Sequence, residues 1–576
     1  MAEALTLPRR TFVACLVAIL ALGAALRFAF PAADPPWNPT VGVVWHDEGA
    51  WTHNARNKAL FGTWSADAWN PMFIAPVFTG LEYASFKAFG VGVRQARLVP
   101  EVLGWASVLV LALGVAHIAG GRAGLIAAAL LATNYVYVMW NRAALMETPM
   151  TAFIVASWYC YTRAAQSPRW GWGAGAFALA AFFTKASAAF FVAAIALDTL
   201  LMLALGRDRR VARTVMLSGI ICAALALVVF VVPNWHDYRF YNWQMSVTRK
   251  PSYSFSALVD RASWFPVLHD LFTRMWFTLL VGIAGGLGLL ARWRQAAAGE
   301  RLLGWWVGLG ALELVLHDVG NERRFVFFIP AFVALAAIVL ARDRVLLPPA
   351  IATVTRARAL LVLPIVAYAM YVTAGALVRI GFLYEVGPNV RIAAAVAAAL
   401  TALLYATWPA IPAWLSRGAW SPRAATVVVL AVCAGQLVQY GQWAAGRTYK
   451  NVEASRAVGR LLPAGTLVHG ILANGLSLEN QIRPIFVGRG FGNYDDRKTR
   501  DDVRYILTYV APRLGFESQA RNPVIQDVLD AYPNHRTIMT FEVSGIASGV
   551  GRAALIDKFG VVSPLRNEHT TGREDD

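Results

Sequence analysis

The apolar run TFVACLVAILALGAALRFAF, residues 11–30, sets the architecture of the chain. A helix of about 20 apolar residues is long enough to cross the hydrocarbon layer of a bilayer. Arg9 and Arg10 precede the run, and no clear small-x-small cleavage site follows it. We therefore interpret the run as a retained membrane anchor rather than a secretory signal. A long hydrophilic segment follows the anchor.

The composition extends this interpretation to most of the chain. Of the 576 residues, 57% are hydrophobic and 15% are charged, and the mean hydropathy is +0.49. Such a chain must place its apolar surface in lipid. We predict a mostly α, polytopic membrane protein of about thirteen transmembrane helices. The apolar runs lie near residues 11–30, 98–117, 123–140, 150–164, 171–184, 186–206, 214–233, 271–291, 302–317, 325–341, 359–379, 391–414 and 423–443.

Arginine placement predicts the orientation of these helices. Arginines gather on alternate connections, which the positive-inside rule assigns to the cytoplasm together with the N-terminus. The segments 31–97, 234–270 and 317–324, the turn before Met150 and everything after 443 are then extracytoplasmic. These arginines also explain the net charge of +18, so no nucleic-acid partner is expected. The four cysteines lie in predicted membrane segments and indicate neither a disulfide nor a metal site.

Two hydrophilic segments interrupt the membrane pattern. The first external loop, residues 31–97, is too long for a simple connection, and its tryptophans predict amphipathic juxtamembrane helices, one over 48–61. Alternating apolar residues after the membrane part, residues 1–443, predict a small extracytoplasmic α/β domain over 444–565 and a disordered tail over 566–576. The predicted strands of that domain are Thr466–Ile471, Ile482–Val487, Val503–Val510, Thr537–Val543 and Ala553–Asp557, with helices over 451–462 and 522–531.

Two acidic positions on the predicted external side suggest chemistry. Asp47 and Glu48 are adjacent in the first loop, and Glu147 stands where the chain re-enters the membrane. Each has a structural explanation, because Asp47 could cap a helix that begins at Glu48, and an acid in a first helical turn complements the helix dipole. Since two such positions share one face of the membrane, we favour a functional role for the pair.

The order of these and further motifs resembles a known family. The matching features are Asp47-Glu48, Arg97-Leu98, the Arg142 to Glu147 turn, Thr184-Lys185, and the Arg324-Phe325 stretch that runs to Pro330. Over roughly residues 11–345 the chain resembles the GT-C superfamily of lipid-linked sugar transferases. The similar branch contains the protein O-mannosyltransferases and the bacterial transferase that adds aminoarabinose to lipid A. Two departures, Trp69-Asn-Pro-Met-Phe73 in place of a His-Pro-Pro-like element and Ala186 in place of glycine after the lysine, concern the sugar pocket and the acceptor.

The resemblance implies an inverting glycosyltransferase in a bacterial-type inner (plasma) membrane, with its site outside the cytoplasm. The donor would be a polyprenyl-phosphate-linked sugar, and the acceptor an extracytoplasmic lipid, glycan or protein. A carboxylate would serve as base, and cations would meet the charge on the leaving lipid phosphate. The expected roles are Asp47 as base, Glu48 as helper, Glu147 as second essential acid, and Lys185, Arg324, Arg142 and Arg97 as phosphate-binding cations.

Other side chains on the predicted external face are weaker candidates for substrate binding. They are His46, His317, Asp318, Trp243 and Tyr253. The spacing of the histidines and acids gives no metal motif, and the resemblance implies no catalytic metal, although a divalent ion is conceivable. Arg323 we interpret as a boundary arginine that extends to the water interface.

Two other classes of function remain open from the sequence. A lipid-linked glycan transporter or flippase would also need buried charges, but midplane charges and repeated halves are expected there. A non-catalytic assembly protein would keep the fold and tolerate the loss of Asp47.

Overall fold

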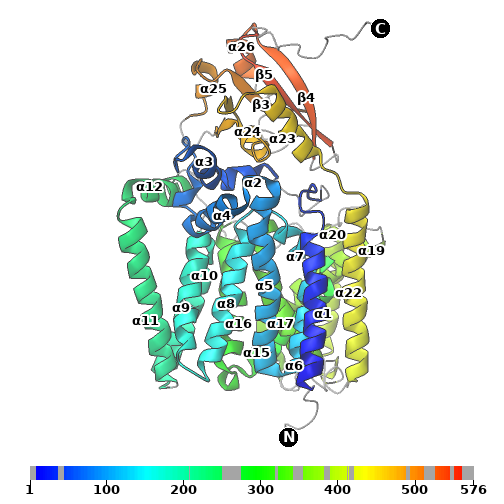
Figure 1. The fold of residues 1–576 in the computed structure, drawn as a ribbon. Helices are drawn as coiled ribbons and strands as arrows, with labels where there is room; N and C mark the ends of the chain where they lie inside the picture. The colour runs from blue at the N-terminus through cyan, green and yellow to red at the C-terminus, as the bar shows by residue number, and fades with distance from the viewer. Residues whose placement is uncertain are drawn as a thin grey trace.

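The computed structural model describes residues 8–36, 45–206, 208–248, 274–317, 322–341, 354–381, 390–411, 413, 421–487, 493–511, 526–544 and 550–560. A bundle of roughly parallel and antiparallel helices carries an α/β unit at one end, and a layer of short helices lies between them (Figure 1). Helix α1 (Arg9–Phe28) begins at the opposite end of the bundle.

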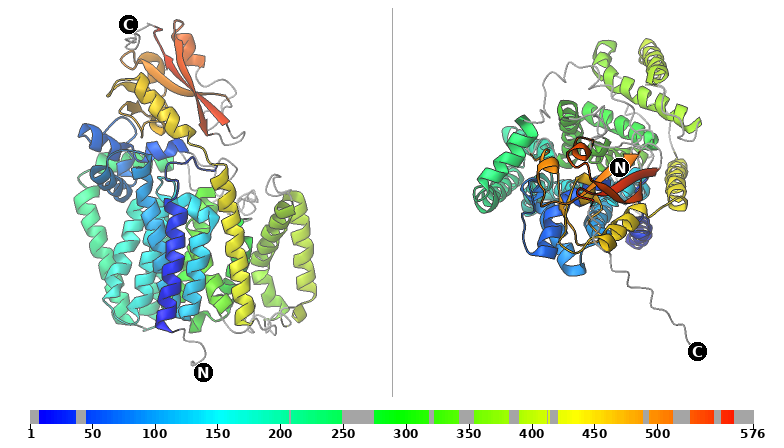
Figure 2. Two further views of the ribbon diagram at one scale, coloured as in Figure 1. Left: turned by 45° about the vertical axis from the view of Figure 1, so that its right-hand side comes forward. Right: turned by 90° about the horizontal axis from the view of Figure 1, so that it is seen from above.

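The helices of the bundle confirm a mostly helical, multi-pass membrane protein. Among the described residues, six helices are long and apolar enough to cross a membrane, or seven if one bent pair is a single span, and three shorter helices are apolar. The count of about thirteen stays a prediction. After α1 the bundle contains α5 (Val93–Ala119), α6 (Gly121–Thr133), α7 (Tyr135–Asn141), α8 (Glu147–Ala164), α9 (Trp170–Thr184), α10 (Ala189–Ala204), α11 (Arg209–Ala226), α15 (Trp276–Ala291), α16 (Ala298–His317), α17 (Phe328–Ala341), α19 (Arg356–Gly381), α20 (Val390–Ala406) and α22 (Pro422–Ala445). Figure 2 shows α19 and α20 beside the main bundle.

The predicted helix over 123–140 is broken. The axes of α6 and α7 differ by 62°, and the break lies at Asn134, whose side chain accepts a hydrogen bond from Tyr137 N. By accepting this hydrogen bond, the Asn134 side chain satisfies a backbone N–H group in the first turn of α7 and so allows a new helix to begin there. The turn after α7 consequently delivers Glu147 to the end of the bundle that carries the α/β unit.

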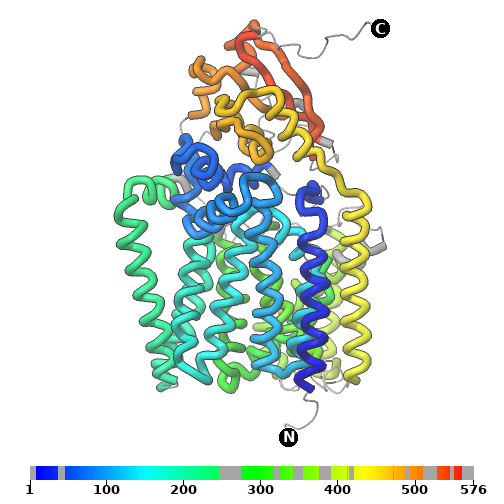
Figure 3. Tube along the Cα trace, viewed as in Figure 1, coloured from blue at the N-terminus to red at the C-terminus, as the bar shows by residue number. Residues whose placement is uncertain are grey.

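The segment between α1 and α5 forms the intermediate layer, the blue tube between bundle and α/β unit in Figure 3. It contains α2 (Trp45–Trp51), α3 (His53–Phe61), the 3-10 turn η1 (Pro71–Phe73) and α4 (Pro76–Phe89). The helix predicted over 48–61 is therefore two helices. An amphipathic boundary helix does not describe α3, because its residues 53–57 are all buried and mostly polar.

The C-terminal unit, residues 450–560, confirms the predicted α/β pattern. Its strands are β1 (Leu467–His469), β2 (Arg483–Ile485), β3 (Tyr505–Ala511), β4 (Arg536–Ser544) and β5 (Val550–Asp557), in the order β2-β1-β3-β5-β4. Its helices are α23 (Lys450–Leu461), α24 (Ile471–Gly475), α25 (Asp496–Thr499) and α26 (Gln526–Ala531). The first three strands are parallel, and β5 is antiparallel to β3 and β4. The domain boundaries stay a prediction, and the tail from 566 lies outside the described residues.

Buried polar contacts hold the C-terminal unit on the intermediate layer. Arg56, which is 1% exposed, donates hydrogen bonds to the carbonyls of Ser477, Asn480 and Ile482. Nearer the membrane, Asp34 accepts from the backbone N–H groups of Lys450 and Asn451 and so satisfies the first turn of α23 from outside that helix.

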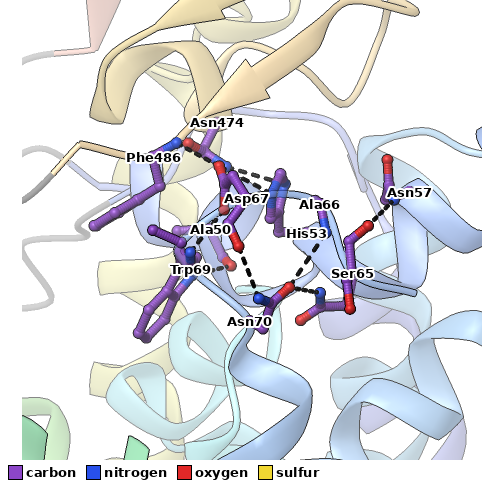
Figure 4. A network of polar contacts seen from close by, with 12 residues as sticks. Ala50, His53, Asn57, Ser65, Ala66, Asp67, Trp69, Asn70, Asn474 and Phe486 are labelled. Carbon is purple, nitrogen blue, oxygen red and sulfur yellow. Dashed lines mark hydrogen bonds and ion pairs between the residues drawn. The ribbon is translucent and has the colours of Figure 1, made fainter. Parts of the chain in front are cut away.

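A second contact network is seen in Figure 4, where His53, Asp67 and Asn474 lie close together and Asp67 contacts the backbone of Phe486. Asn474 Nδ2 lies 3.1 Å from His53 Nδ1, and Asp67 accepts from Phe486 N at 2.6 Å. Because buried polar groups without partners are costly, these contacts indicate that the two layers are built as one unit.

Candidate functional site

The short helix α2 places Asp47 at the junction of the bundle and the intermediate layer. Asp47 is the third residue of α2, so it is not the helix cap that the sequence allowed. Its side chain is 16% exposed, and its Oδ2 accepts a hydrogen bond from Arg323 Nη1 at 2.6 Å. A carboxylate in this position is fixed by a partner and still open to a substrate.

Glu147 is the first residue of α8 and lies close to the same arginine. Its Oε1 is 3.5 Å from Arg323 Nε and accepts a hydrogen bond from Lys185 Nζ at 2.5 Å. The carboxylate is 3% exposed. Through Arg323 the fold brings Asp47 and Glu147 together, although α3 to α7 lie between them in the chain.

Arg323 shows where the sequence interpretation was wrong. It lies in the 3-10 turn η7 (Glu322–Phe325), is 17% exposed, and pairs with both acids instead of extending to the water interface. The argument that singled out Lys185, a positive charge on the side where such charges are disfavoured, applies equally to Arg323. That signal could have found it.

Lys185 sits in the turn between α9 and the 3-10 turn η2 (Ala186–Ala188). Burial lowers its pKa to about 8, since loss of hydration outweighs the attraction of Glu147, and the nearby Arg324 and Arg323 lower it further. Three cations and two carboxylates therefore meet among the described residues of this site. Such an arrangement favours the approach of an anion.

Glu48 belongs to a different environment from its neighbour Asp47. Its two oxygens accept from Arg97 Nε at 2.8 Å and Arg97 Nη2 at 2.7 Å, and Oε1 also accepts from Ala144 N. Glu48 is 4% exposed and Arg97 3% exposed. This bidentate pair joins α2, α5 and the turn before α8, so Arg97 is engaged by Glu48 and its role toward the donor stays a prediction.

Arg142 is also used away from the acids. Its guanidinium donates hydrogen bonds to the carbonyls of Arg27, Ala29 and Phe30 and lies over the ring of Trp443 at 4.6 Å. It therefore satisfies the carboxyl-terminal end of α1. The structure does not bring Arg142 to the acid and cation cluster, which corrects its predicted place.

The remaining candidates separate into three cases. His46 is 2% exposed, with Nε2 3.6 Å from Asp47 Oδ1 and Nδ1 3.4 Å from Tyr509 Oη. Trp243 is 58% exposed on the π-helix Phe240–Thr248. Asp318, Tyr253 and the side chain of His317 lie outside the described residues. Within the described part of the chain, no three His, Cys, Asp or Glu side chains are grouped as metal ligands.

An apolar groove of about 340 Å³ lies between α9, α11 and the start of α4. It reaches Phe183, two residues before Lys185 in the chain, so one part of it lies near this lysine. Its lining residues are Pro76, Val77, Ala176, Leu179, Ala180, Phe183, Cys222, Ala226 and Phe230.

Comparison with known proteins gives a partial family match. Residues 75–236 match the family model of the dolichyl-phosphate-mannose-protein mannosyltransferases. Over this stretch the chain is similar to that family of glycosyltransferases. The matched residues contain Glu147 and Lys185, whereas Asp47 and Arg323 lie outside them. No curated protein is a significant match to this chain in sequence.

Among solved structures, ArnT has a similar fold. ArnT from Cupriavidus metallidurans bound to undecaprenyl phosphate is 13% identical, with a TM-score of 0.54 and coverage of 95% of this chain and 97% of that chain. Its apo form gives 14% identity at the same TM-score and coverage. The Archaeoglobus fulgidus oligosaccharyltransferase in the apo form is 12% identical, with a TM-score of 0.45 and coverage of 87% and 70%. This chain therefore shares the architecture of ArnT over nearly its whole length.

Proposed function

We propose that the protein transfers a sugar from a polyprenyl-phosphate donor to an extracytoplasmic acceptor with inversion at the anomeric carbon. The observation that carries this proposal is the cluster of Lys185, Arg323 and Arg324 beside Asp47 and Glu147. Cations suited to a phosphate and an accessible carboxylate suited to an acceptor proton meet at one site. The membrane would be a bacterial-type inner membrane, with the C-terminal unit on its outer side.

The reaction assigns a task to each group. The acceptor nucleophile attacks the anomeric carbon while Asp47 takes its proton, and the bond from that carbon to the phosphate oxygen breaks. The bonding electrons leave with the lipid phosphate, whose charge Lys185 and Arg324 stabilise. No covalent enzyme intermediate is needed, because attack and departure occur on opposite faces of the sugar.

Arg323 links donor binding to the base in this mechanism. Without donor its guanidinium neutralises Asp47 and Glu147. A bound phosphate attracts the same guanidinium away from Asp47. Because the positive charge disfavours protonation of the Asp47 carboxylate, its departure makes Asp47 a stronger base. Glu147 holds Lys185 toward the phosphate and can accept hydrogen bonds from sugar hydroxyls. Glu48 supports the site through Arg97 instead of acting on the substrate.

The groove between α9 and α11 suits the lipid part of the donor. Its lining is apolar and includes Phe183, two residues before Lys185. A polyprenyl chain in the groove would bring its phosphate to the cations. The bound undecaprenyl phosphate named for the ArnT structure supports a ligand of this class.

The proposal is tested by transfer of radiolabelled sugar in proteoliposomes. We expect turnover with a polyprenyl-phosphate sugar, and none with the matching polyprenyl-diphosphate or nucleotide sugar. An extract of the cell envelope supplies lipid, glycan and protein acceptors, and the labelled fraction identifies the acceptor class. Turnover only with a nucleotide sugar would contradict the proposal, and label that moves across the membrane without being transferred would favour a flippase.

The groove gives a prediction about donor affinity. Ala176→Trp fills the groove from an exposed position on α9. Loss of contact with about two CH2 groups costs about 1.5 kcal/mol, or about a tenfold loss of affinity. We expect a corresponding rise in KM for a long-chain donor at nearly unchanged kcat. Ala223→Trp, on an exposed part of α11 that does not line the groove, is the control, and equal KM values for the two variants would remove the groove from donor binding.

Lys185 gives a prediction about pH. Its pKa of about 8 means that the side chain loses its positive charge as the pH rises through that value in the donor-free enzyme. Donor KM should therefore increase above about pH 8, while Lys185→Arg, whose guanidinium stays charged, should show no such increase. The measurement is donor KM between pH 6.5 and 9.5 for both proteins. Parallel profiles would show that another group titrates.

A further inference from the structure

The three parallel strands of the C-terminal unit end at the intermediate layer, which holds Asp47. β1 lies between β2 and β3, so the chain leaves β1 to one side and returns on the other. In open α/β sheets the crevice outside the carboxyl ends at such a reversal is where ligands bind. Here the intermediate layer occupies that crevice.

Each of the three strands makes a contact there. The contacts are Asn474 Nδ2 with His53 Nδ1 at 3.1 Å, Phe486 N with Asp67 Oδ2 at 2.6 Å, and Tyr509 Oη with His46 Nδ1 at 3.4 Å. Asn474 follows β1, Phe486 follows β2, and Tyr509 lies near the end of β3. The third contact reaches the residue next to Asp47.

The backbone of α2 touches the C-terminal unit directly. A Cβ atom on Gly49 would lie 1.8 Å from the carbonyl oxygen of Asn474, so no other residue fits without movement of the backbone. Gly49 is two residues from Asp47 on a helix of only two turns. The position of the helix that carries Asp47 consequently depends on the C-terminal unit.

The chemistry of His46 connects Tyr509 to Asp47. The Asp47 carboxylate can only accept a hydrogen bond, so the favourable tautomer of His46 carries its hydrogen on Nε2, 3.6 Å from Asp47 Oδ1. Nδ1 is then the acceptor, and the Tyr509 hydroxyl donates to it. The hydrogen bond that Nδ1 accepts thus fixes the ring hydrogen on Nε2.

We propose that the C-terminal unit completes the active site, with Tyr509 as a positioning residue that acts through His46 on Asp47. This inference rests on the proposed role of Asp47 as base. The C-terminal unit is then a part of the catalytic machinery. Tyr509 contacts His46 although it follows that residue by 463 positions in the chain.

The surroundings of His46 agree with an orienting role. The charged groups that act on it are Asp47 from α2 and Arg323 from η7, and Tyr509 from β3 is its neutral partner. Burial is the main cause that holds the pKa of His46 below its usual range, against the attraction of Asp47. A neutral imidazole presents one N–H toward the carboxylate, with Nε2 3.6 Å from Asp47 Oδ1, and does not compete with Asp47 for the acceptor proton at neutral pH.

The first experiment compares Tyr509→Phe with the wild type. Loss of one neutral hydrogen bond predicts about a fivefold fall in kcat with donor KM within about twofold. The acidic limb of the kcat profile should move to higher pH, because the ionised carboxylate loses an oriented N–H neighbour. Tyr505→Phe, which removes a hydroxyl from the other end of β3, is the control. An unchanged kcat and an unchanged pH profile for Tyr509→Phe would overturn the proposal.

A double-mutant cycle tests the route through His46. In His46→Gln the amide donates to Asp47 without help from Tyr509, so Tyr509→Phe should have no further effect in that background. The same fivefold fall in both backgrounds would place the action of Tyr509 elsewhere. If Tyr509→Phe does not fold, His46→Gln must retain more kcat than His46→Leu, and equal losses would contradict the proposal.

The inference and the proposed function can fail separately. If Asp47→Asn keeps full turnover, the base assignment itself is wrong. If Asp47→Asn is inactive and Tyr509→Phe behaves as the wild type, the base assignment stands and the C-terminal unit does not position it.

Discussion

Replacement of Asp47 by Asn should lower kcat about 10³-fold, the usual contribution of a general base. Asparagine has nearly the same shape and can still accept a hydrogen bond from Arg323, but it cannot take the acceptor proton. Because Asp47 and Arg323 are both partly exposed, folding should change little. Single-turnover transfer in proteoliposomes measures the chemical step, and donor binding by the variant should stay within about threefold of the wild type.

The chain offers a matched control for this substitution. His236 and Asp237 repeat the His-Asp dipeptide of the site on α12 (Trp235–Arg239), where the Asp237 side chain is 51% exposed. Asp237→Asn should leave kcat unchanged. If Asp47→Asn and Asp237→Asn have the same kcat as the wild type, a carboxylate base at residue 47 is excluded.

Replacement of the neighbouring Glu48 by Gln should act on stability. The buried pair with Arg97 loses its negative partner, and an uncompensated buried charge costs about 3–5 kcal/mol. The neutral amide also presents an N–H group to a guanidinium that can only donate. Thermal unfolding in detergent should show a lower Tm than that of Asp47→Asn. Substitution of Asp47 would then reduce catalysis, whereas substitution of the adjacent Glu48 would reduce stability.

The control for Glu48→Gln is Glu453→Gln, an exposed acid in the first turn of α23, which should keep the Tm of the wild type to within a few degrees. A stable but inactive Glu48→Gln would restore Glu48 to the catalytic role that the sequence suggested. In that case Arg97→Met should be less stable than Glu48→Gln.

Local sequence patterns were sufficient to predict an element where its structure depends mainly on its own residues. The five predicted strands of the C-terminal unit are all present, because β-branched residues in alternation describe half-buried strands without reference to other parts of the chain. Periodicity alone could not predict the break at Asn134, since the apolar run continues through it. It also could not predict that α3 buries Arg56, because the partners of this arginine are carbonyls more than 400 residues away.

The candidate site likewise contains residues that the sequence could identify and contacts that it could not. Asp47, Glu147 and Lys185 could be selected from their side of the membrane, and the fold brings the three together through Arg323. Arg142 was assigned to the cluster by its spacing from Glu147, yet the bend between α6 and α7 turns it toward the carbonyls of α1. The hydrogen bond between Tyr509 and His46 links residues too far apart for any spacing rule. Such contacts are set by tertiary structure alone.

The anchoring of Arg56 has a consequence for the synthesis of the protein. Its partners Ser477, Asn480 and Ile482 follow it by 421, 424 and 426 residues, so the ribosome makes nearly the whole membrane bundle before any of them exists. Until then the guanidinium of Arg56 and the imidazole of His53 must stay hydrated. A nascent or truncated chain that lacks the C-terminal unit would hold its bundle in the membrane with an unfinished site, and the capacity to consume lipid-linked sugar would arise only near the end of translation.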